Sequence, residues 1–254
     1  MPIRVSIVSY TNTLPFVYGL DQLESSAETS DFLITKDYPS RCAASLLSGE
    51  ADIALAPVAI LATNPHLRIC SDYCISANGT VDSVLLLSNV PLEQISHITL
   101  DYQSRTSNLL VQVLARYFWH IAPHYSASNE GYENSATGSE AVVVIGDRAL
   151  ENGSKYRYKY DLAEEWFRMT QMPFVFAAWV STKEISTEKL SMFNDALGFG
   201  IDHLDDAIAS VPPKIHFDID DYLRNKISYP LTDQKRDALA LFIKYVNELL
   251  QLAE

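Results

Sequence analysis

The sequence is poor in cysteine, which limits the covalent and metal chemistry open to it. It contains three cysteines, Cys42, Cys70 and Cys74, in 254 residues. An odd and sparse set argues against a disulfide framework and indicates reduced thiols, which are typical of a cytoplasmic protein. Cys70 and Cys74 have neither a second cysteine pair nor a histidine nearby in the sequence, so a metal pair is the weaker interpretation. We expect structural thiols, no metal ion and a cytoplasmic location.

Positive charge is also scarce. The chain has 19 lysine and arginine residues against 32 aspartate and glutamate residues, which gives a formal net charge of −13. Binding to nucleic acids and to anionic membranes requires a positive field, so neither is an expected partner. A small anionic ligand remains possible, because local arginines and helix N-termini can still attract it.

Long hydrophobic runs are missing as well. No apolar stretch approaches the length of a transmembrane helix, and the first residues show no apolar signal core followed by a small-residue cleavage site. We therefore expect neither a membrane partner nor a secretion signal. The histidines show no metal-ligand spacing and are expected to be structural or exposed; they are His66, His97, His120, His124, His203 and His216.

Short apolar runs alternate with helical patterns along a chain long enough for one large or two modest domains. Strands are predicted at residues 3–10, 32–35, 52–56, 84–87, 98–101 and 141–145. Helical patterns fall between them, and residues 239–250 form a further amphipathic helical pattern. This alternation predicts an α/β fold with mostly parallel sheets covered by helices. Residues 126–140, rich in Ser, Asn and Gly, are predicted to be a surface loop.

The first candidate site is the polar turn after the first predicted strand. It contains Ser9, Tyr10, Thr11, Asn12 and Thr13. Ligands of open α/β sheets bind at the carboxyl ends of strands, and these side chains offer hydrogen bonds without fixed charge. An ordinary helix cap followed by core aromatics is an equally good interpretation of this segment.

The second candidate site is the segment at residues 101–108, between a predicted strand and a helical pattern. Ser104, Thr106 and Ser107 supply three hydroxyls at the start of the helix, and Arg105 adds a positive charge. The unpaired N–H groups of a helix start attract anions, and an arginine can bind a carboxylate through charge-assisted bonds. The alternative is a single N-cap hydroxyl with Arg105 in solvent. More hydroxyls are present than capping requires, so we favour anion binding.

The third candidate site follows the predicted strand at residues 141–145. Gly146 would let the backbone approach a ligand closely, and Asp147 could orient a polar group of the substrate or act as a base. Alternatively, Asp147 caps the next helix. Arg148 is predicted to be solvated.

Seven sequence blocks follow one another between residues 3 and 180. They are Ser9–Leu20, Ser48–Val58, Ser83–Ser88, Ser104–Ser107, Ile145–Leu150, Asp161–Trp166 and Pro173–Trp179. Each block alone is a weak signal, but in this order they resemble the chorismate dehydratase family of the futalosine route to menaquinone. Two positions depart from the family pattern: Thr11 stands where an apolar residue is common, and Leu14 where a basic residue sometimes stands. The second departure removes a possible carboxylate contact and places more weight on Ser104–Ser107.

The resemblance implies a two-lobed periplasmic-binding-protein-like fold of type II, with the ligand in a cleft between two α/β lobes. The first lobe would comprise residues 1–88 and 180–254, and the second lobe residues 89–179. The lobes would form one functional unit, and their closure would exclude water from the substrate.

The resemblance also implies a reaction, the loss of water from chorismate to give 3-[(1-carboxyvinyl)oxy]benzoate, with no cofactor. Asn12 and Ser83 resemble the catalytic pair of the family. The expected substrate contacts are Ser9, Tyr10, Ser104, Arg105, Thr106, Ser107, Gly146 and Asp147. The general base stays open between Asp147 and a carboxylate of the substrate itself.

Two alternatives share the implied fold. A solute-binding protein would carry out no chemistry, but a secreted receptor is expected to begin with a signal peptide or a lipobox. The 1,4-dihydroxy-6-naphthoate synthase of the same route is expected to use a histidine base, and no histidine falls within the seven blocks. Both points favour the dehydratase, although fold alone cannot decide among them.

Overall fold

The computed structural model describes residues 2–25, 31–213 and 217–252. Contacts between Cα atoms divide the chain into two units, unit 1 with residues 1–76 and 175–232, and unit 2 with residues 77–174 and 233–254. Within the described ranges, no helix is long and apolar enough to cross a membrane. His216 lies outside the described residues.

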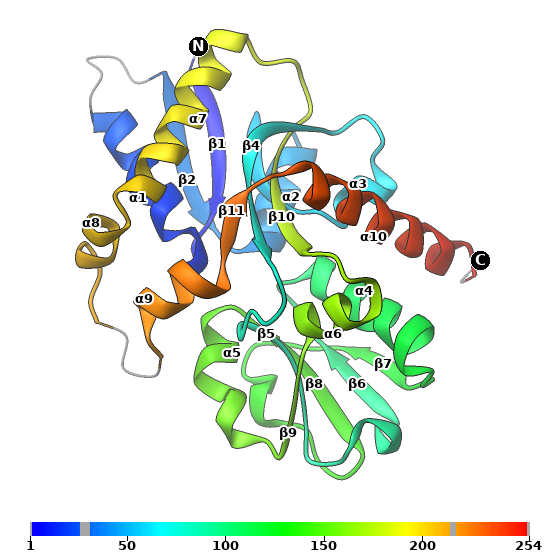
Figure 1. The fold of residues 1–254 in the computed structure, drawn as a ribbon. Helices are drawn as coiled ribbons and strands as arrows, with labels where there is room; N and C mark the ends of the chain where they lie inside the picture. Colours follow the sequence, from blue (N-terminus) through cyan, green and yellow to red (C-terminus); the bar gives the residue numbers. More distant parts are fainter. Residues whose placement is uncertain (1, 26–30, 214–216, 253–254) are drawn as a thin grey trace. The chain divides into compact units, whose positions relative to one another are not determined.

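Unit 1 is built on a six-stranded mixed sheet (Figure 1). Strand β1 is parallel to both of its neighbours, β2 and β3, whereas β10 is antiparallel to β3 and β11 is antiparallel to β4. In spatial order the strands are β11 (Ser228–Pro230), β4 (Arg68–Ala77), β10 (Phe174–Ser181), β3 (Ile53–Pro57), β1 (Ile3–Val8) and β2 (Phe32–Asp37).

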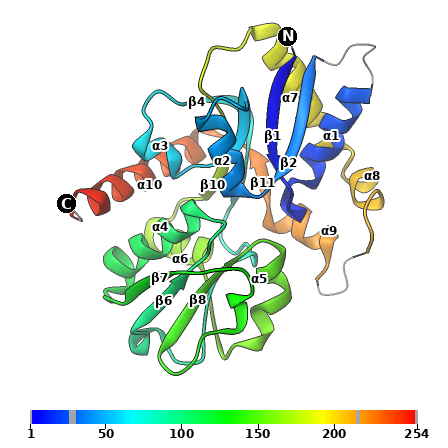
Figure 2. The same ribbon diagram turned by 180° about the vertical axis from the view of Figure 1, so that it is seen from behind.

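Helices cover this sheet, and two of them, α1 (Leu14–Ser25) and α7 (Thr187–Asp202), lie side by side in Figures 1 and 2. Their crossing is so close that a Cβ atom on Gly19 would lie 1.9 Å from the backbone oxygen of Ala196. Glycine at this crossing therefore fixes the position of α1 on the unit. The other helical segments of unit 1 are η1 (Thr11–Thr13), α2 (Pro39–Leu47), α3 (Ile60–Thr63), α8 (Leu204–Ala209), α9 (Ile219–Asp221) and the π-helix η6 (Tyr222–Lys226).

Unit 2 contains a five-stranded mixed sheet. Strand β6 is parallel to β7 and β8, and β5 is antiparallel to β8 and β9. The spatial order is β7 (His124–Ala127), β6 (His97–Leu100), β8 (Glu140–Ile145), β5 (Val84–Ser88) and β9 (Tyr158–Asp161). The strand pairing brings the ends of β6 and β8 and the start of β5 to one edge of the sheet.

Two helices, α4 (Arg105–Leu114) and α5 (Asp147–Asn152), flank the strands of unit 2 on opposite sides (Figure 2). The last helix, α10 (Asp233–Gln251), belongs to unit 2. Its Phe242 is buried, with ring centroids 5.0 Å from Phe174 and 6.0 Å from Trp166. The other helical segments are η2 (Leu92–Gln94), the π-helix η3 (Ala115–Trp119), η4 (Tyr132–Asn134), η5 (Gly153–Lys155) and α6 (Leu162–Thr170).

The observed elements differ from the sequence expectation in three respects, the first of which is that five observed strands, β4, β7, β9, β10 and β11, were not predicted. All six predicted strands are present with small shifts at their ends, but the sheets are mixed rather than mostly parallel. The predicted surface loop at residues 126–140 contains the buried side chains of Tyr132 and Glu133. Those two residues make polar contacts to neighbouring elements, which a composition rich in Ser, Asn and Gly does not reveal.

The unit boundaries also differ from the expected lobes. The expected crossings were after residues 88 and 179, and the observed ones follow residues 76, 174 and 232. The first shift arises because β5 pairs with β8 and β9, in the sheet of unit 2. Helix α10 was expected in the first lobe, but its buried face packs on Trp166 and Phe174 of unit 2.

Candidate functional site

The turn after β1 is locked by hydrogen bonds from Thr13. Its Oγ1 lies 2.6 Å from the carbonyl oxygen of Val8 and 2.8 Å from that of Tyr10, and the side chain is buried. The backbone N–H of Thr13 also donates to the Tyr10 oxygen, at 3.1 Å. Thr13 is therefore a structural residue, which holds the strand end against the start of α1.

The side-chain oxygen of Asn12, in the middle of this turn, is unusual in its burial and its hydrogen bonding. Its Oδ1 is fully buried and has no hydrogen-bond partner among the described residues. A buried acceptor without a partner costs about 1–3 kcal/mol, so such groups in proteins generally have a partner, a water or a ligand. In the same turn Ser9 is exposed and Tyr10 is half-buried. The Asn12 oxygen can accept a hydrogen bond from a hydroxyl of a ligand.

In unit 2, Ser83 lies beside Gly146 at one edge of the sheet. The N–H of Gly146 donates to the carbonyl oxygen of Ser83 at 2.7 Å, and the next residues, Val84 and Ile145, are paired in the sheet. Gly146 has φ 63° and ψ −148°, a conformation that is essentially restricted to glycine. The chain can therefore turn from β8 into α5 directly next to Ser83.

Asp161 fixes the backbone immediately before Ser83, and sequence reasoning missed this role. One carboxylate oxygen accepts the N–H groups of Val81 and Asp82 at 2.9 and 2.6 Å. The other oxygen accepts those of Ala163 and Glu164 at 3.0 and 3.1 Å, which caps α6. Burial raises the pKa of the Asp161 carboxyl to about 6, against the opposing effect of these N–H donors. An Asp followed three residues later by Glu is a capping signal that could have revealed half of this arrangement.

The start of α4 has a hydroxyl that caps the helix, that of Ser104, and another that can still donate a hydrogen bond, that of Ser107. Ser104 is the N-cap, as the alternative interpretation expected of one hydroxyl: its Oγ accepts the Ser107 N–H at 3.1 Å and donates to the Ser107 Oγ at 2.9 Å. Since the Ser107 hydroxyl accepts this bond, its own proton can point elsewhere. Thr106 and Ser107 are buried, while Arg105 is exposed and forms no ion pair within the described part of the chain.

The prediction that Arg148 is solvated is wrong. Its guanidinium donates to the carboxylates of Asp101 at 2.8 Å and Glu133 at 2.7 Å, and its side chain is 21% exposed. It also donates to Oε1 of Gln103 at 3.0 Å. These partners come from segments distant in sequence, so the sequence around Arg148 gave no sign of them. Asp147, beside it, is the first residue of α5 and is half-buried.

The structure thus brings several predicted residues of unit 2 to one edge of its sheet. They are Ser83, Ser104, Arg105, Thr106, Ser107, Gly146 and Asp147. The link between the second and third candidate sites is the ion pair of Arg148 with Asp101. Ser9, Tyr10 and Asn12 belong to unit 1, where they share the turn after β1.

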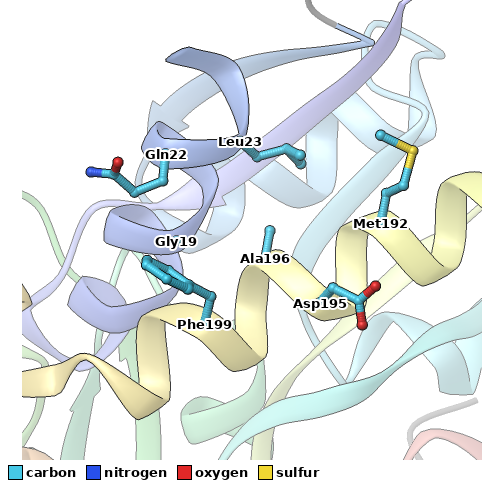
Figure 3. A pocket seen from close by; sticks show the side chains of 7 residues that line it. All are labelled: Gly19, Gln22, Leu23, Met192, Asp195, Ala196 and Phe199. Carbon is cyan, nitrogen blue, oxygen red and sulfur yellow. The ribbon is translucent and has the colours of Figure 1, made fainter. Parts of the chain in front are cut away.

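A groove on unit 1, between α1 and α7, contains none of the predicted site residues (Figure 3). It is lined by Gly19, Gln22, Leu23, Met192, Asp195, Ala196 and Phe199. No lysine or arginine is among the described residues that line it, and Asp195 contributes a carboxylate. The groove is therefore poorly suited to an anionic ligand.

None of the three cysteines, all within the described residues, forms a disulfide; Cys42 and Cys74 are buried and Cys70 is half-buried. Burial raises the pKa of the Cys42 thiol to about 11 and that of Cys70 to about 12. Both thiols are consequently protonated at neutral pH and poor nucleophiles. In the residues that the structure describes, no three side chains of His, Cys, Asp or Glu are grouped to hold a metal ion.

A model of the menaquinone biosynthesis family matches residues 3–248. The chain belongs to this family. A chorismate dehydratase of Thermus thermophilus is 27% identical over 194 residues, which cover 67% of this chain and 71% of that protein. The family resemblance drawn from the ordered sequence blocks is therefore confirmed.

Solved structures similar to this member of the menaquinone biosynthesis family identify its fold. A protein of Archaeoglobus fulgidus matches with a TM-score of 0.75 at 13% identity, over 99% of this chain and 98% of its own. The periplasmic aliphatic sulphonate binding protein of Escherichia coli matches with a TM-score of 0.62 at 12% identity, over 99% and 87% of the two chains. The expected periplasmic-binding-protein-like α/β fold is confirmed.

Proposed function

We propose that the protein is a chorismate dehydratase, which removes water from chorismate to give 3-[(1-carboxyvinyl)oxy]benzoate. The observation that carries this proposal is the similarity to the chorismate dehydratase of Thermus thermophilus, 27% identical over 194 residues. The polar groups described in both units agree with the chemistry that this reaction needs.

In this reaction the ring carbon that bears the enolpyruvyl ether loses a proton, and the C–H electron pair forms a new ring double bond. The neighbouring carbon loses its hydroxyl, which leaves with a proton as water. The ring becomes aromatic, and this aromatisation drives the reaction. The protein must hold a dianion, stabilise the electron-rich transition state and assist the departing hydroxyl.

The start of α4 is the proposed site for a substrate carboxylate. Its first-turn N–H groups and the helix dipole favour an anion. The Ser107 hydroxyl, which accepts the bond from Ser104, can donate to a carboxylate oxygen, and the exposed Arg105 can add a charge-assisted bond. Thr106 is the third hydroxyl of this group, and the residues Ser9, Tyr10 and Gly146 are further proposed contacts.

Asn12 and Ser83 are the proposed catalytic residues. The buried Oδ1 of Asn12 lacks a hydrogen-bond partner among the described residues, so it can accept a bond from the departing hydroxyl while the amide N–H₂ donates to the same oxygen. Ser83 is buried in a turn that Asp161 holds in place. Its hydroxyl can orient a carboxylate or relay a proton.

For the general base we propose a carboxylate of the substrate itself, which lies close to the proton that is removed. Asp147 would then position neighbouring groups at the start of α5. Its place as the first residue of the helix also suits a charge that stabilises the helix dipole.

A non-catalytic solute-binding protein is the second candidate, because a sulphonate-binding protein shares the fold. The naphthoate synthase of the same pathway remains the third candidate. One experiment separates them: the purified protein is incubated with chorismate, with and without a chelator, and the products are analysed by chromatography and mass spectrometry.

We expect the enolpyruvyl benzoate to form at the same rate in both samples. Chorismate that binds but is recovered unchanged would favour a solute-binding protein, and failure to bind chorismate would overturn the proposal. Activity that is lost with a chelator and restored by a divalent metal would contradict the cofactor-free mechanism. A cytoplasmic location is part of the proposal and is supported by the three described cysteines, none of which forms a disulfide.

A further inference from the structure

Arg148 lies at the centre of a polar cluster that has no role in the proposed reaction. The cluster contains two carboxylates, those of Asp101 and Glu133, and one guanidinium. The Asp101 side chain is completely buried and that of Glu133 is 11% exposed. With Arg148 the three charges sum to −1, and without it they would sum to −2.

The guanidinium of Arg148 is fixed from several directions. Its two terminal nitrogens donate to Glu133 at 2.7 Å, Asp101 at 2.8 Å and Gln103 at 3.0 Å. Its central carbon also lies 5.0 Å from the ring centroid of Tyr102 and 5.9 Å from that of Tyr132. Cation–π contacts of this kind are strongest where the cation is shielded from water. The guanidinium thus bridges Asp101 and Glu133 in a fixed position, unlike that of a surface arginine.

Asp101 connects this bridge to the start of α4. Its Oδ1 accepts the N–H of Gln103 at 2.7 Å, and its backbone exchanges two hydrogen bonds with the Asn108 side chain, at 3.0 and 2.8 Å. The cap residue Ser104 is the next residue after Gln103. The side chain of Asp101 therefore shapes the turn from which α4 begins.

We propose that Arg148 is a positioning residue for the carboxylate site at the start of α4, where it neutralises Asp101 and fixes the turn from Asp101 to Ser104. This inference rests on the proposed function, since it concerns the same carboxylate site. A buried Asp101 without its cation would place an uncompensated negative charge near a bound dianion. A buried charge left without its partner is strongly destabilising.

The surroundings of Asp101 supply the expected pH response. The groups that contact its carboxylate are Arg148 of α5, Tyr132 of η4 and the N–H of Gln103 in its own turn. Glu133 shares the Arg148 guanidinium, and Tyr102 also interacts electrostatically with Asp101. Burial raises the pKa of Asp101, while the positive charge of Arg148 lowers it. Loss of Arg148 should therefore raise this pKa further, and acid would then neutralise Asp101 in place of the arginine.

The test compares Arg148→Met, Asp101→Asn and the double variant with the wild-type protein. We expect Arg148→Met to raise the KM for chorismate at neutral pH by at least about tenfold, with a change in kcat below about threefold. Its KM should fall as the pH is lowered, as Asp101 takes up a proton. Adding Asp101→Asn should bring the KM back to within about threefold of the wild-type value.

A matched control is Arg168→Met, which removes another arginine of unit 2 that is paired with two carboxylates, Glu164 and Glu165. Because its side chain is 58% exposed, its loss should leave the KM unchanged. If Arg148→Met fails to fold, Arg148→Lys serves instead; it keeps the charge but cannot bridge three acceptors. The lysine variant should show a small change in KM without the pH response.

Hydrogen exchange gives a readout that does not depend on activity. The amide protons of Gln103 and Ser107 should exchange faster in Arg148→Met than in the wild type or Arg168→Met. Faster exchange in a protein that does not dehydrate chorismate would refute the proposed function and leave the positioning role intact. Unchanged exchange, or a further increase in KM on addition of Asp101→Asn, would overturn the inference about Arg148.

Discussion

The side-chain oxygen of Asn12 is buried in the turn after β1 and has no hydrogen-bond partner among the described residues. A buried acceptor without a partner suits a ligand that has a hydroxyl, because the hydrogen bond from that hydroxyl then forms only in the complex. The residue is therefore the most direct point at which the proposed reaction can be tested.

We expect Asn12→Ala to lower kcat by about two to three orders of magnitude, as for the loss of one preorganised hydrogen-bond partner of a transition state. The KM should change much less, because other residues hold the carboxylates. Steady-state kinetics with chorismate measures both, and alanine at the exposed Asn129 serves as the control. A variant with normal kcat and a raised KM would reassign Asn12 to uniform binding.

Asp147→Asn tests the identity of the base. The amide keeps the size and much of the capping ability of the carboxylate while it removes basicity. Since we assign the base to the substrate, we expect a loss in kcat below the roughly hundredfold that removal of a general base typically causes. A larger loss in a folded variant that still binds chorismate would identify Asp147 as the base.

Asp161 should make stability depend on pH in a defined direction. Its pKa is raised to about 6 in the folded protein, above the unfolded value of about 3.9. The folded state then binds the proton more tightly, so its contribution to stability is complete below about pH 4 and is lost as the pH rises through about 6. The expected loss is about 3 kcal/mol.

Urea unfolding of the wild type and Asp161→Asn between about pH 4 and pH 7 measures this contribution. The difference in unfolding free energy between the two proteins should shrink as the pH rises and become constant above about pH 7. A difference that does not vary with pH would show that Asp161 titrates normally.

Sequence reasoning selected most of the proposed site residues because they stand at strand ends and in recognisable blocks, and their catalytic and binding roles stay predictions. It failed for Arg148, whose partners Asp101 and Glu133 lie far away in the chain. The residues next to a charged side chain in the sequence do not indicate which distant residue it will pair with, so only the fold reveals the partner. Asp161 was missed for the same reason, since two of its four N–H donors come from residues 81 and 82.

At the scale of elements, the crossing of α1 and α7 sets the position of the Asn12 turn. A Cβ atom on Gly200 would lie 1.8 Å from the carbonyl oxygen of Pro15, three residues after Asn12. Backbone atoms at this distance must move apart, and the start of α1 would move with them. The glycine is therefore tied to the position of the proposed catalytic residue Asn12, although it lies outside the proposed site.

We expect Gly200→Ala to lower the unfolding free energy by about 1–3 kcal/mol through overpacking, even though alanine favours a helix by about 1 kcal/mol over glycine. The kcat should fall together with stability. Gly198→Ala is the matched control on the same helix, because its Cβ would meet the tip of the Tyr73 side chain, at 2.7 Å, which can move. Equal effects of the two substitutions would contradict this account.

Sequence patterns missed five strands, of which β7, β9 and β11 are short, whereas β4 and β10 have 10 and 8 residues. Strand β11 has three residues, and β7 has four, of which three are exposed. Such segments become strands because a longer neighbour supplies hydrogen bonds, as β4 does for β11. Buried strands such as β1 and β8 were predicted correctly, since five of the six side chains in each are buried and most of those are apolar.

At the scale of the whole molecule, the family pattern fixed the fold but misplaced α10. An amphipathic stripe indicates that one face is buried, and it does not say which unit covers that face. The ring contacts of Phe242 with Trp166 and Phe174 assign the helix to unit 2.

We expect Phe242→Ala to destabilise unit 2 by about 3–5 kcal/mol, the usual cost of removing a buried phenylalanine. Hydrogen exchange should become faster in β5 and β8 and stay near normal in β1. Leu250→Ala, at an exposed position of the same helix, is the control and should have little effect. Faster exchange confined to unit 1 would contradict the assignment of α10.

The place of β10 in the sheet of unit 1 has a consequence for synthesis on the ribosome. Strands β3 and β4 are made early, yet β10 lies between them, so the nascent chain exposes an open β3 edge until residue 181 emerges. At ordinary rates of translation this interval lasts roughly 6–25 s. An unpaired strand edge is a template for aggregation, so the newborn chain should depend on chaperones far more than the finished protein does.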